Sequence, residues 1–401
     1  MNELSSIALI LLLALLAGHL VKFIHVPEVT GYILAGIAVG PSMLGWINEQ
    51  NLASLSIFSE VALALILFSI GSIFEFRRFR EVGKTIVVIT LIECALVTSL
   101  VTAAALFMGQ KWETALLLGT VAMETGAAST LMVLREYNAD GPLTQVITGA
   151  IAINNLVCLT CFLLLTSGLQ LAGRLGMGDG ASLYSTVYSV IWQLIGSAAL
   201  GYLVGLLLAA WSTKVTEHGE TLILLIGSVL LCAGLAVLLN LSILVVSLVL
   251  GATTANLSAH TGRLAQVQSR TDPPFYAVFF VIAGAHLQLG LLKTLGLLGL
   301  AYILARAVGK LTGTYLGSKL VKAPRSVSAR LGPSVLAHAG LAIGLVLSLS
   351  RQYPQVNAEL TAVVLGGILV YEVIGPISVR KMILRAGESH ARIAEAMEVL
   401  E

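Results

Sequence analysis

Seven ionisable residues fall inside apolar stretches of this sequence, where a charged side chain is costly to place in a membrane or a protein core. Such a residue either forms a structural pair or handles an ion or a proton, so these seven are the first candidates for function. Two of them, Glu60 and Glu93, stand closer to the ends of their stretches, and for these we expect structural hydrogen bonds. The seven are Glu60, Glu93, Glu124, Arg306, Lys310, His338 and Glu372.

Glu124 stands near the middle of its apolar stretch, within the run AMETGAAST that covers residues 122–130. Gly, Ser and Thr in this run weaken a helix, and a break near residues 122–127 would expose backbone carbonyls and helix ends that suit ion coordination. Thr125 would add a hydroxyl oxygen. The alternative is a kinked helix in which Glu124 forms a structural pair with a base.

His338 occupies a comparable depth in a later stretch, within AHAGL at residues 337–341. The sequence predicts a second break near residues 336–341, facing the first. Histidine titrates near physiological pH, so His338 could carry a proton. The alternative is a neutral histidine that is hydrogen-bonded to a backbone carbonyl.

Polar residues also interrupt two further stretches. Asn154 and Asn155 are adjacent amides in an apolar helix, and they could bridge helices or present carbonyl oxygens to an ion. Arg306 needs an acid or many carbonyls, because an unpaired buried cation is expensive. Glu124 is a plausible partner for it. Lys310, one helical turn away, either lines the same path or extends toward the membrane surface.

The elements that position these residues are membrane helices. The chain has 401 residues, 57% of them hydrophobic and 11% charged, whereas soluble domains carry about 25% charged residues. A membrane helix needs about 20 mostly apolar residues. Thirteen stretches qualify: 4–24, 29–47, 57–73, 84–108, 113–135, 142–168, 184–212, 220–239, 241–258, 273–289, 291–319, 328–350 and 358–384. The split near Gly290 has the weakest signal.

The basic residues give an orientation. With the N-terminus outside, most of the 23 Lys and Arg residues fall in the inside segments, and only Lys111, Arg174, Lys293 and Arg351 lie outside. The positive-inside rule therefore predicts an outer N-terminus and a cytoplasmic C-terminus. The first stretch lacks a basic start and a cleavage site, so we interpret it as a retained helix.

An odd number of spans predicts two six-helix halves of opposite orientation, a signature of transporters whose site lies at the interface of inverted repeats. The halves would be residues 1–168 and 220–385. Residues 169–219 would supply a linker helix with its loops, and residues 386–401 a short cytoplasmic tail.

Several function classes are disfavoured. The net charge of +2 and the scattered basic residues do not suggest nucleic acid. The four cysteines all fall in apolar segments without metal-ligand spacing. We find no nucleophile–base pair and no metal motif, so we expect neither an enzyme nor a cofactor.

Four motifs together resemble the monovalent cation:proton antiporter-2 family, within the sodium/proton antiporter superfamily. The resemblance covers about residues 1–385. It rests on VPEVTGYILAGIAVGP at 26–41, SEVALALILFSIG at 59–71, FFVIAGAHLQ at 279–288 and YEVIGP at 371–376.

This resemblance implies an all-α fold with a dimerising scaffold and a mobile core, in which two interrupted helices, 113–135 and 328–350, cross. It implies a homodimer paired through early apolar helices, in a bacterial inner membrane. Family members carry Asp-Asp or Asn-Asp at the positions that match Asn154 and Asn155, and the second Asp binds the ion and the proton. That carboxylate is absent here. A basic residue of the family's later core helix matches Arg306.

The main hypothesis is therefore a cation:proton antiporter with a relocated acid. Glu124 would alternate between a proton, Arg306 and a sodium or potassium ion, and Asn154 would assist as a neutral oxygen. The cation would sit at Glu124, Thr125 and Asn155. A second hypothesis is a transporter of the same fold that carries an anion or organic acid on Arg306. A third is a membrane sensor or partner subunit without transport.

Overall fold

The computed structural model describes residues 3–24, 26–73, 76–172, 191–215, 217–258, 261–286, 296–338, 340–352 and 358–390, together with positions 188 and 290. Every regular element within these ranges is a helix. The first part of the chain forms α1 (Glu3–Phe23), α2 (Glu28–Val39), α3 (Glu49–Ile73), α4 (Phe76–Phe107), α5 (Trp112–Ala122), α6 (Ala127–Glu136) and α7 (Pro142–Leu171).

The second part begins with a π-helical turn, η1 (Trp192–Gly196). It continues with α9 (Ser197–Trp211), α10 (His218–Leu238), α11 (Ile243–Leu257), α12 (Thr261–His286) and α14 (Gly296–Leu320). The short α15 (Arg325–Ser328) and α16 (Leu331–Ser334) precede α17 (Gly340–Gln352) and α18 (Ala358–Ala386). The predicted boundary near Gly290 and most of the predicted tail lie outside the described residues.

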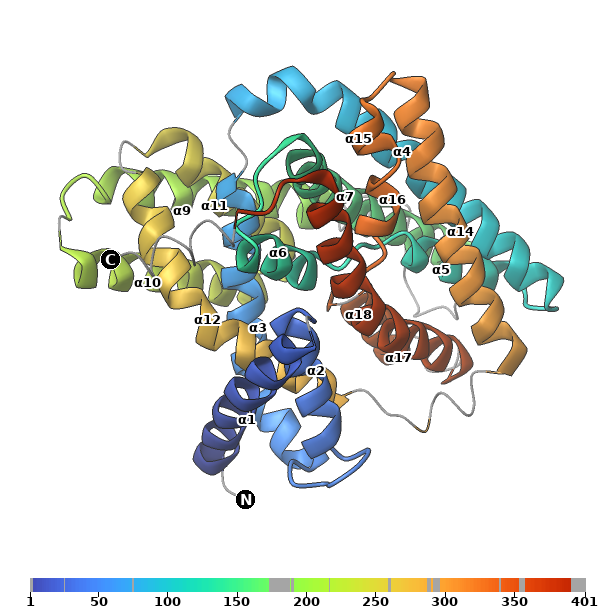
Figure 1. Ribbon diagram of the computed structural model, residues 1–401, viewed down its shortest axis with the longest axis horizontal. Helices are drawn as coiled ribbons and strands as arrows, with labels where there is room; N and C mark the ends of the chain where they lie inside the picture. Colours follow the sequence, from blue (N-terminus) through green and yellow to red (C-terminus); the bar gives the residue numbers. More distant parts are fainter. Residues whose placement is uncertain are drawn as a thin grey trace.

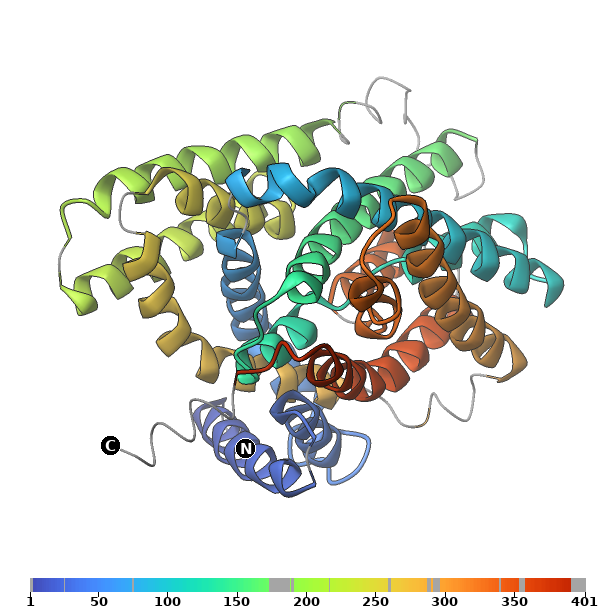
Figure 2. The same ribbon diagram turned by 45° about the horizontal axis from the view of Figure 1, so that its top comes forward.

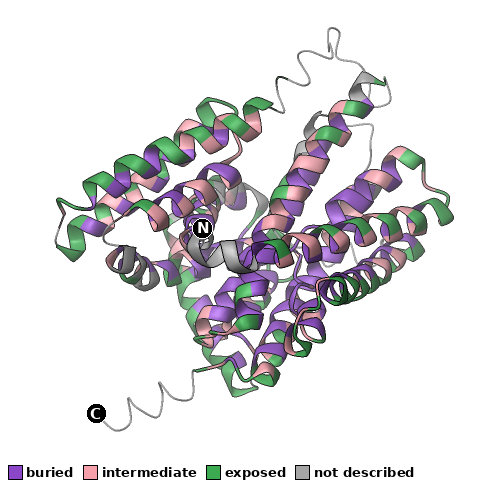
Figure 3. Cartoon of the chain, turned by 90° about the horizontal axis from the view of Figure 1, so that it is seen from above, coloured by how far each residue is buried: buried purple, intermediate pink, exposed green. Residues whose placement is uncertain are grey.

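The chain is a multi-pass membrane protein. Seven described helices are long and apolar enough to cross a bilayer, and three shorter apolar helices accompany them. Large apolar side chains are exposed on the outer helices, for example Leu12 and Leu16 of α1 and Ile223 and Leu231 of α10. Exposed residues follow the outer faces of the long helices (Figure 3). Lipid covers such faces without cost.

The helices pack in two groups (Figure 1). One group contains α1–α3 and α9–α12. The other contains α4–α7 and α14–α18, and the same grouping is visible in the turned view of Figure 2. The groups meet where α2 and α3 pack against α6, and where α2 packs against α18.

Glycines allow unusually close helix crossings in both groups. In the first group, a Cβ on Gly36 of α2 would collide with backbone atoms of α12, and one on Gly284 of α12 with backbone atoms of α2. Gly71 of α3 and Gly251 of α11 form a second reciprocal pair. Small residues drive helix association in membranes because they let backbones approach.

In the second group, α14 presents Gly309, Gly313 and Gly317 to α4 at four-residue spacing. A Cβ on Gly313 would lie 2.6 Å from the Cα of Glu93, and a Cβ on Gly309 would lie 2.7 Å from the Cα of Val97. The helix backbones therefore touch along this seam. That contact brings the middle of α4, with Glu93, against the polar residues of α14.

Two helices are interrupted where the sequence predicted breaks. In the first interrupted helix, α5 ends at Ala122 and α6 begins at Ala127. In the second, α16 ends at Ser334 and α17 begins at Gly340. Both unwound segments lie in the interior, and Glu124, Thr125 and His338 are at most 1% exposed.

Candidate functional site

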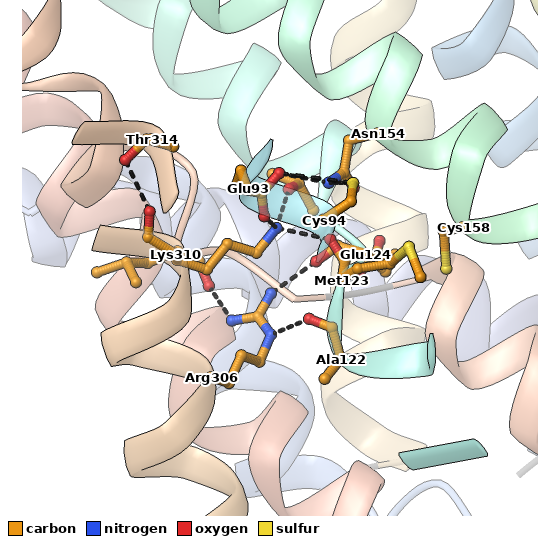
Figure 4. Close-up of polar contacts among 12 residues, drawn as sticks. Glu93, Cys94, Ala122, Met123, Glu124, Asn154, Cys158, Arg306, Lys310 and Thr314 are labelled. Atoms are coloured by element: carbon orange, nitrogen blue, oxygen red, sulfur yellow. Dashed lines mark hydrogen bonds and ion pairs between the residues drawn. The ribbon is translucent and has the colours of Figure 1, made fainter. Parts of the chain in front are cut away.

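The two unwound segments meet at the centre of the second helix group. The backbone N–H of Gly126 donates a hydrogen bond of 2.9 Å to the carbonyl oxygen of Ala337. Each break leaves carbonyls without helical partners, and a buried carbonyl needs a donor. The side chains that satisfy them come from α14, which points two cations at this junction (Figure 4).

Arg306 joins both breaks. Its guanidinium, 0% exposed, donates four hydrogen bonds to backbone carbonyls, two on each broken helix. A planar fork of five N–H donors is well suited to such a task. The acceptors are Ala122 at 2.9 Å, Glu124 at 2.7 Å, Leu336 at 2.7 Å and Ala337 at 3.0 Å.

The pairing of Arg306 with the Glu124 carboxylate, suggested by the sequence, needs correction. The bond between these residues runs to the backbone carbonyl of Glu124. The guanidinium also lies 4.3 Å from the ring centroid of Tyr371 of α18. Partial negative charge on carbonyls and an aromatic face therefore stabilise Arg306 in its buried position.

The Glu124 carboxylate instead bonds to His338. Glu124 Oε2 lies 2.7 Å from His338 Nδ1, and His338 Nε2 lies 2.9 Å from the hydroxyl of Tyr302 on α14. A neutral imidazole with its proton on Nδ1 donates to the carboxylate and accepts from Tyr302. The three side chains thus form one buried hydrogen-bonded chain that links the first break, the second break and α14.

Lys310 forms a second polar cluster, on the other side of the first break. Its ammonium, 0% exposed, lies 2.6 Å from Glu93 Oε1 and donates to the Met123 carbonyl at 2.6 Å and to Thr125 Oγ1 at 2.7 Å. Asn154 Nδ2 donates to Glu93 Oε2 at 2.9 Å. The expectation that Lys310 could reach the membrane surface is wrong, because Glu93 and the unwound segment hold it in the interior.

A small cavity of about 50 Å³ adjoins Glu124. It lies between the helix groups, lined by apolar residues of α3, α11 and α12 on one side and by α6, α7 and α17 on the other. Among the described residues, Glu124 and Asn155 are the only ones with polar side chains that line it. Asn155 Oδ1 is buried without a hydrogen-bond partner. Thr125 does not line the cavity, because its hydroxyl faces Lys310.

The six residues selected from the sequence therefore separate into three roles. Arg306 links the two breaks, and Thr125 and Asn154 contact the Lys310–Glu93 pair. Glu124 and Asn155 adjoin the cavity, and His338 is bonded to Glu124. Within the described residues, no group of three or more His, Cys, Asp or Glu side chains could hold a metal ion.

Sequence reasoning missed the position and the partner of Glu93. We expected a structural acid near a span end, but Glu93 lies in the middle of α4, 3% exposed and paired with Lys310. One signal could have found it. The four-residue spacing of Gly309, Gly313 and Gly317 predicts a close helix partner, and Glu93 is the acid in α4 that stands opposite Gly313.

Comparisons with known proteins agree with this fold. The family described as "sodium/hydrogen exchanger, transmembrane" matches residues 8–385. The ammonium/H⁺ antiporter subunit AmhT of Alkalihalophilus pseudofirmus is 25% identical over 381 residues, which cover 92% of this chain and 93% of AmhT. The K⁺ efflux antiporter 5 of Arabidopsis thaliana is 27% identical over 201 residues, which cover 48% of this chain and 35% of that protein.

The solved structure of the sodium proton antiporter MjNhaP1 from Methanocaldococcus jannaschii has the same fold. It superimposes with a TM-score of 0.68 at 16% sequence identity, over 96% of this chain and 95% of that one. Because the family match covers almost the whole membrane region, the chain belongs to the sodium/hydrogen exchanger family of membrane cation/proton antiporters.

Proposed function

We propose that this protein exchanges a monovalent cation for protons by alternating access, with Glu124 as the carboxylate that binds each in turn. The observation that carries the proposal is the cavity. Glu124 adjoins it together with the unpartnered Oδ1 of Asn155. A carboxylate oxygen and an amide oxygen are the hard ligands that alkali cations accept, and the volume admits an ion with a few water molecules.

Glu93 is another buried acid near this junction, and its surroundings fit transport less well. Lys310 already neutralises it at 2.6 Å, and Asn154 occupies its second oxygen. A cation would have to displace a fixed ammonium that has two other contacts, with Met123 and Thr125. Glu93 also does not line the cavity. We therefore assign the Lys310–Glu93 pair to holding α4, α7 and the first break together.

His338 gives Glu124 a neutral partner. As a donor through Nδ1, it stabilises the charged carboxylate that must receive the cation. When the carboxylate takes a proton instead, it loses the negative charge that attracts the cation. One proton and one monovalent cation thus compete for the same acid, which is the minimum that exchange requires.

Transport of an anion on Arg306 has less support. All four carbonyl contacts use guanidinium N–H groups that an anion would need, and the side chain is 0% exposed. An anion would have to break bonds that join the two interrupted helices. Arg306 is better suited to stabilising the carbonyl ends of both breaks.

The helix contacts support inverted repeats with the predicted boundaries, 1–168 and 220–385. The proposed correspondence matches α1 with α10, α2 with α11, α3 with α12, α4 with α14, α5–α6 with α16–α17, and α7 with α18. Under this correspondence, two helices that pack together are matched with two helices that also pack together. For example, α2–α12 corresponds to α11–α3, α1–α2 to α10–α11, and α4–α7 to α14–α18. The reciprocal glycines follow the same exchange, with Gly36 and Gly284 corresponding to Gly251 and Gly71.

Alternating access requires the two helix groups to move relative to each other, and polar contacts at the end of α6 would resist that motion. Arg135 pairs with Asp272 of α12, and Glu136 Oε2 accepts a 3.0 Å hydrogen bond from the N–H of Glu28 at the start of α2. With the N-terminus outside, these contacts lie at the cytoplasmic end. We propose that they close that side in this state and break on opening.

The proposed assembly is a homodimer in a bacterial inner membrane. The exposed leucines of α1 give one early apolar helix a face that a second copy could cover. Cross-linking within native membranes tests this point, since a chain that remains monomeric there and in mild detergent would contradict it.

Purified protein in liposomes with an internal pH dye tests the function itself. Sodium, potassium and ammonium gradients should be compared with gradients of organic and inorganic anions. A proton flux that depends on a monovalent cation is the expected result. Flux that follows an anion would favour the Arg306 hypothesis, and no flux with any solute would favour a sensor or partner subunit.

A further inference from the structure

A basic cavity lies at the end of α14, well away from the buried cluster. It has a volume of about 580 Å³ and is lined by Tyr315, Lys319, Lys322, Ala323, Arg325, Ser328 and Ala329. Three of these seven residues are cationic and none is acidic. The side chains of Lys319, Lys322 and Arg325 are exposed, and they form no ion pair with any other residue that the structure describes.

An apolar stripe on α14 leads into this cavity. Leu297, Leu300, Leu304, Val308, Leu311 and Tyr315 are all at least 40% exposed and recur every three or four residues, so they lie along one face of the helix. Tyr315 ends the stripe, and the ammonium of Lys319 lies 5.5 Å from its ring centroid. A tyrosine followed by lysines is typical of the boundary between hydrocarbon and headgroups.

The backbone at Lys322 adds an independent observation. This residue adopts φ of 54°, the left-handed conformation that usually falls to glycine or asparagine after a helix. The other described non-glycine residues with positive φ are Asn138 and Asn240. A glycine would fit the turn between α14 and α15 with less strain, so a lysine at this position points to a role for its charge.

We propose that this cavity binds the headgroup of an anionic phospholipid, with an acyl chain lying along the α14 stripe. Three unpaired cations around a concave surface recognise a phosphodiester, and an apolar face of helical length receives the chain. Neither feature alone would select a lipid. The proposal does not depend on which ion is transported, because it concerns the membrane-facing end of α14.

The test uses the full chain in detergent, titrated with phosphatidylglycerol, phosphatidylcholine or inorganic phosphate. Native mass spectrometry gives the apparent Kd, and thermal unfolding gives the stabilisation. We expect phosphatidylglycerol to bind at least tenfold more tightly than phosphatidylcholine, and inorganic phosphate to give no stabilisation. Each basic residue near a membrane surface contributes about fivefold in affinity, so removing three should cost about 100-fold.

The variant is Lys319→Gln with Lys322→Gln and Arg325→Gln. Its matched control removes three exposed cations from elsewhere in the chain, Lys214→Gln with Lys381→Gln and Arg385→Gln. The first should lose its preference for phosphatidylglycerol and the control should keep it. Lys322→Gly provides a second variant that should fold at least as well as the native chain while binding phosphatidylglycerol about fivefold more weakly.

Four results would overturn the proposal. Equal binding of the two lipids would show that the cavity does not recognise an anionic headgroup. An equal loss in the control would show that only the overall charge of the protein matters. Stabilisation by inorganic phosphate as strong as by phosphatidylglycerol would assign the cavity to a free anion. A change from dimer to monomer in the triple variant, without any lipid dependence, would assign the stripe to a second copy of the chain.

Discussion

Glu93 and Glu124 are both buried carboxylates beside the same broken helix, yet their surroundings differ in charge and in space. Glu93 is paired with a lysine and bonded to an amide, and it does not line the cavity. Glu124 has a histidine as its partner and adjoins a cavity between the two helix groups. The two acids stand on different helices, α4 for Glu93 and the break after α5 for Glu124.

The difference separates support from transport. A buried acid that is permanently matched by a cation contributes to the fold, since removing either partner leaves an uncompensated charge. An acid with a neutral partner and an adjoining cavity can exchange a bound proton for a cation. The same sequence feature, a glutamate in an apolar helix, therefore has different consequences at the two positions. Disturbing the Glu93 pair should lower stability, whereas changing Glu124 should lower flux.

The largest expected effect comes from breaking the Glu93 pair. Lys310→Met leaves the Glu93 carboxylate buried and unpaired, which should cost about 3–5 kcal/mol of stability. Adding Glu93→Gln to Lys310→Met should restore much of the loss. Thermal unfolding in detergent measures both, with Lys381→Met, an exposed cation of α18, as the control. A Lys310→Met protein as stable as the native chain would mean that the pair does not support the fold.

A smaller effect is expected when the same pair is disturbed through the backbone. Gly313→Ala places a Cβ 2.6 Å from the Cα of Glu93, so α4 and α14 must separate. Overpacking of this kind costs about 1–3 kcal/mol. Gly234→Ala in α10 is the matched control, because its Cβ would meet open space. Equal thermal stability of the two variants would contradict the close seam.

The smallest effect should appear on the Glu124 side. His338→Gln weakens a hydrogen bond to a carboxylate without removing it, because the amide of glutamine can still donate. The charged form of Glu124, which must receive the cation, then has less support. The cation concentration at which flux is half-maximal should therefore rise, with little change in thermal stability. An unchanged cation dependence would remove His338 from the exchange.

The sequence predicted an all-helical membrane fold and both breaks because these depend on local properties. Apolar runs of membrane length place the helices, and Gly126 and its neighbours weaken the first of the interrupted ones. The alignment of Asn154 and Asn155 with the family's acidic pair also drew attention to the missing carboxylate. These inferences need no knowledge of which helices touch.

The partners of the charged residues could not be predicted in the same way. Lys310 and Glu93 are far apart in the chain, and their contact depends on how closely α4 and α14 cross. For Arg306 the sequence allowed an acid or carbonyls, and the geometry of two facing breaks selects carbonyls. Pairing is a tertiary property, set by packing more than by the residue types alone.

One measurement tests the assignment of Glu124 most directly. Cation-dependent proton flux and thermal stability should be measured on the same preparations of Glu124→Gln, with Glu60→Gln, an exposed acid of α3, as the control. The account predicts that Glu124→Gln folds but loses flux to the background of empty liposomes, while Glu60→Gln keeps it. Adding Asn155→Asp to Glu124→Gln should recover part of the exchange, because residue 155 lines the same cavity. Normal cation-coupled flux in a well-folded Glu124→Gln protein would contradict the account.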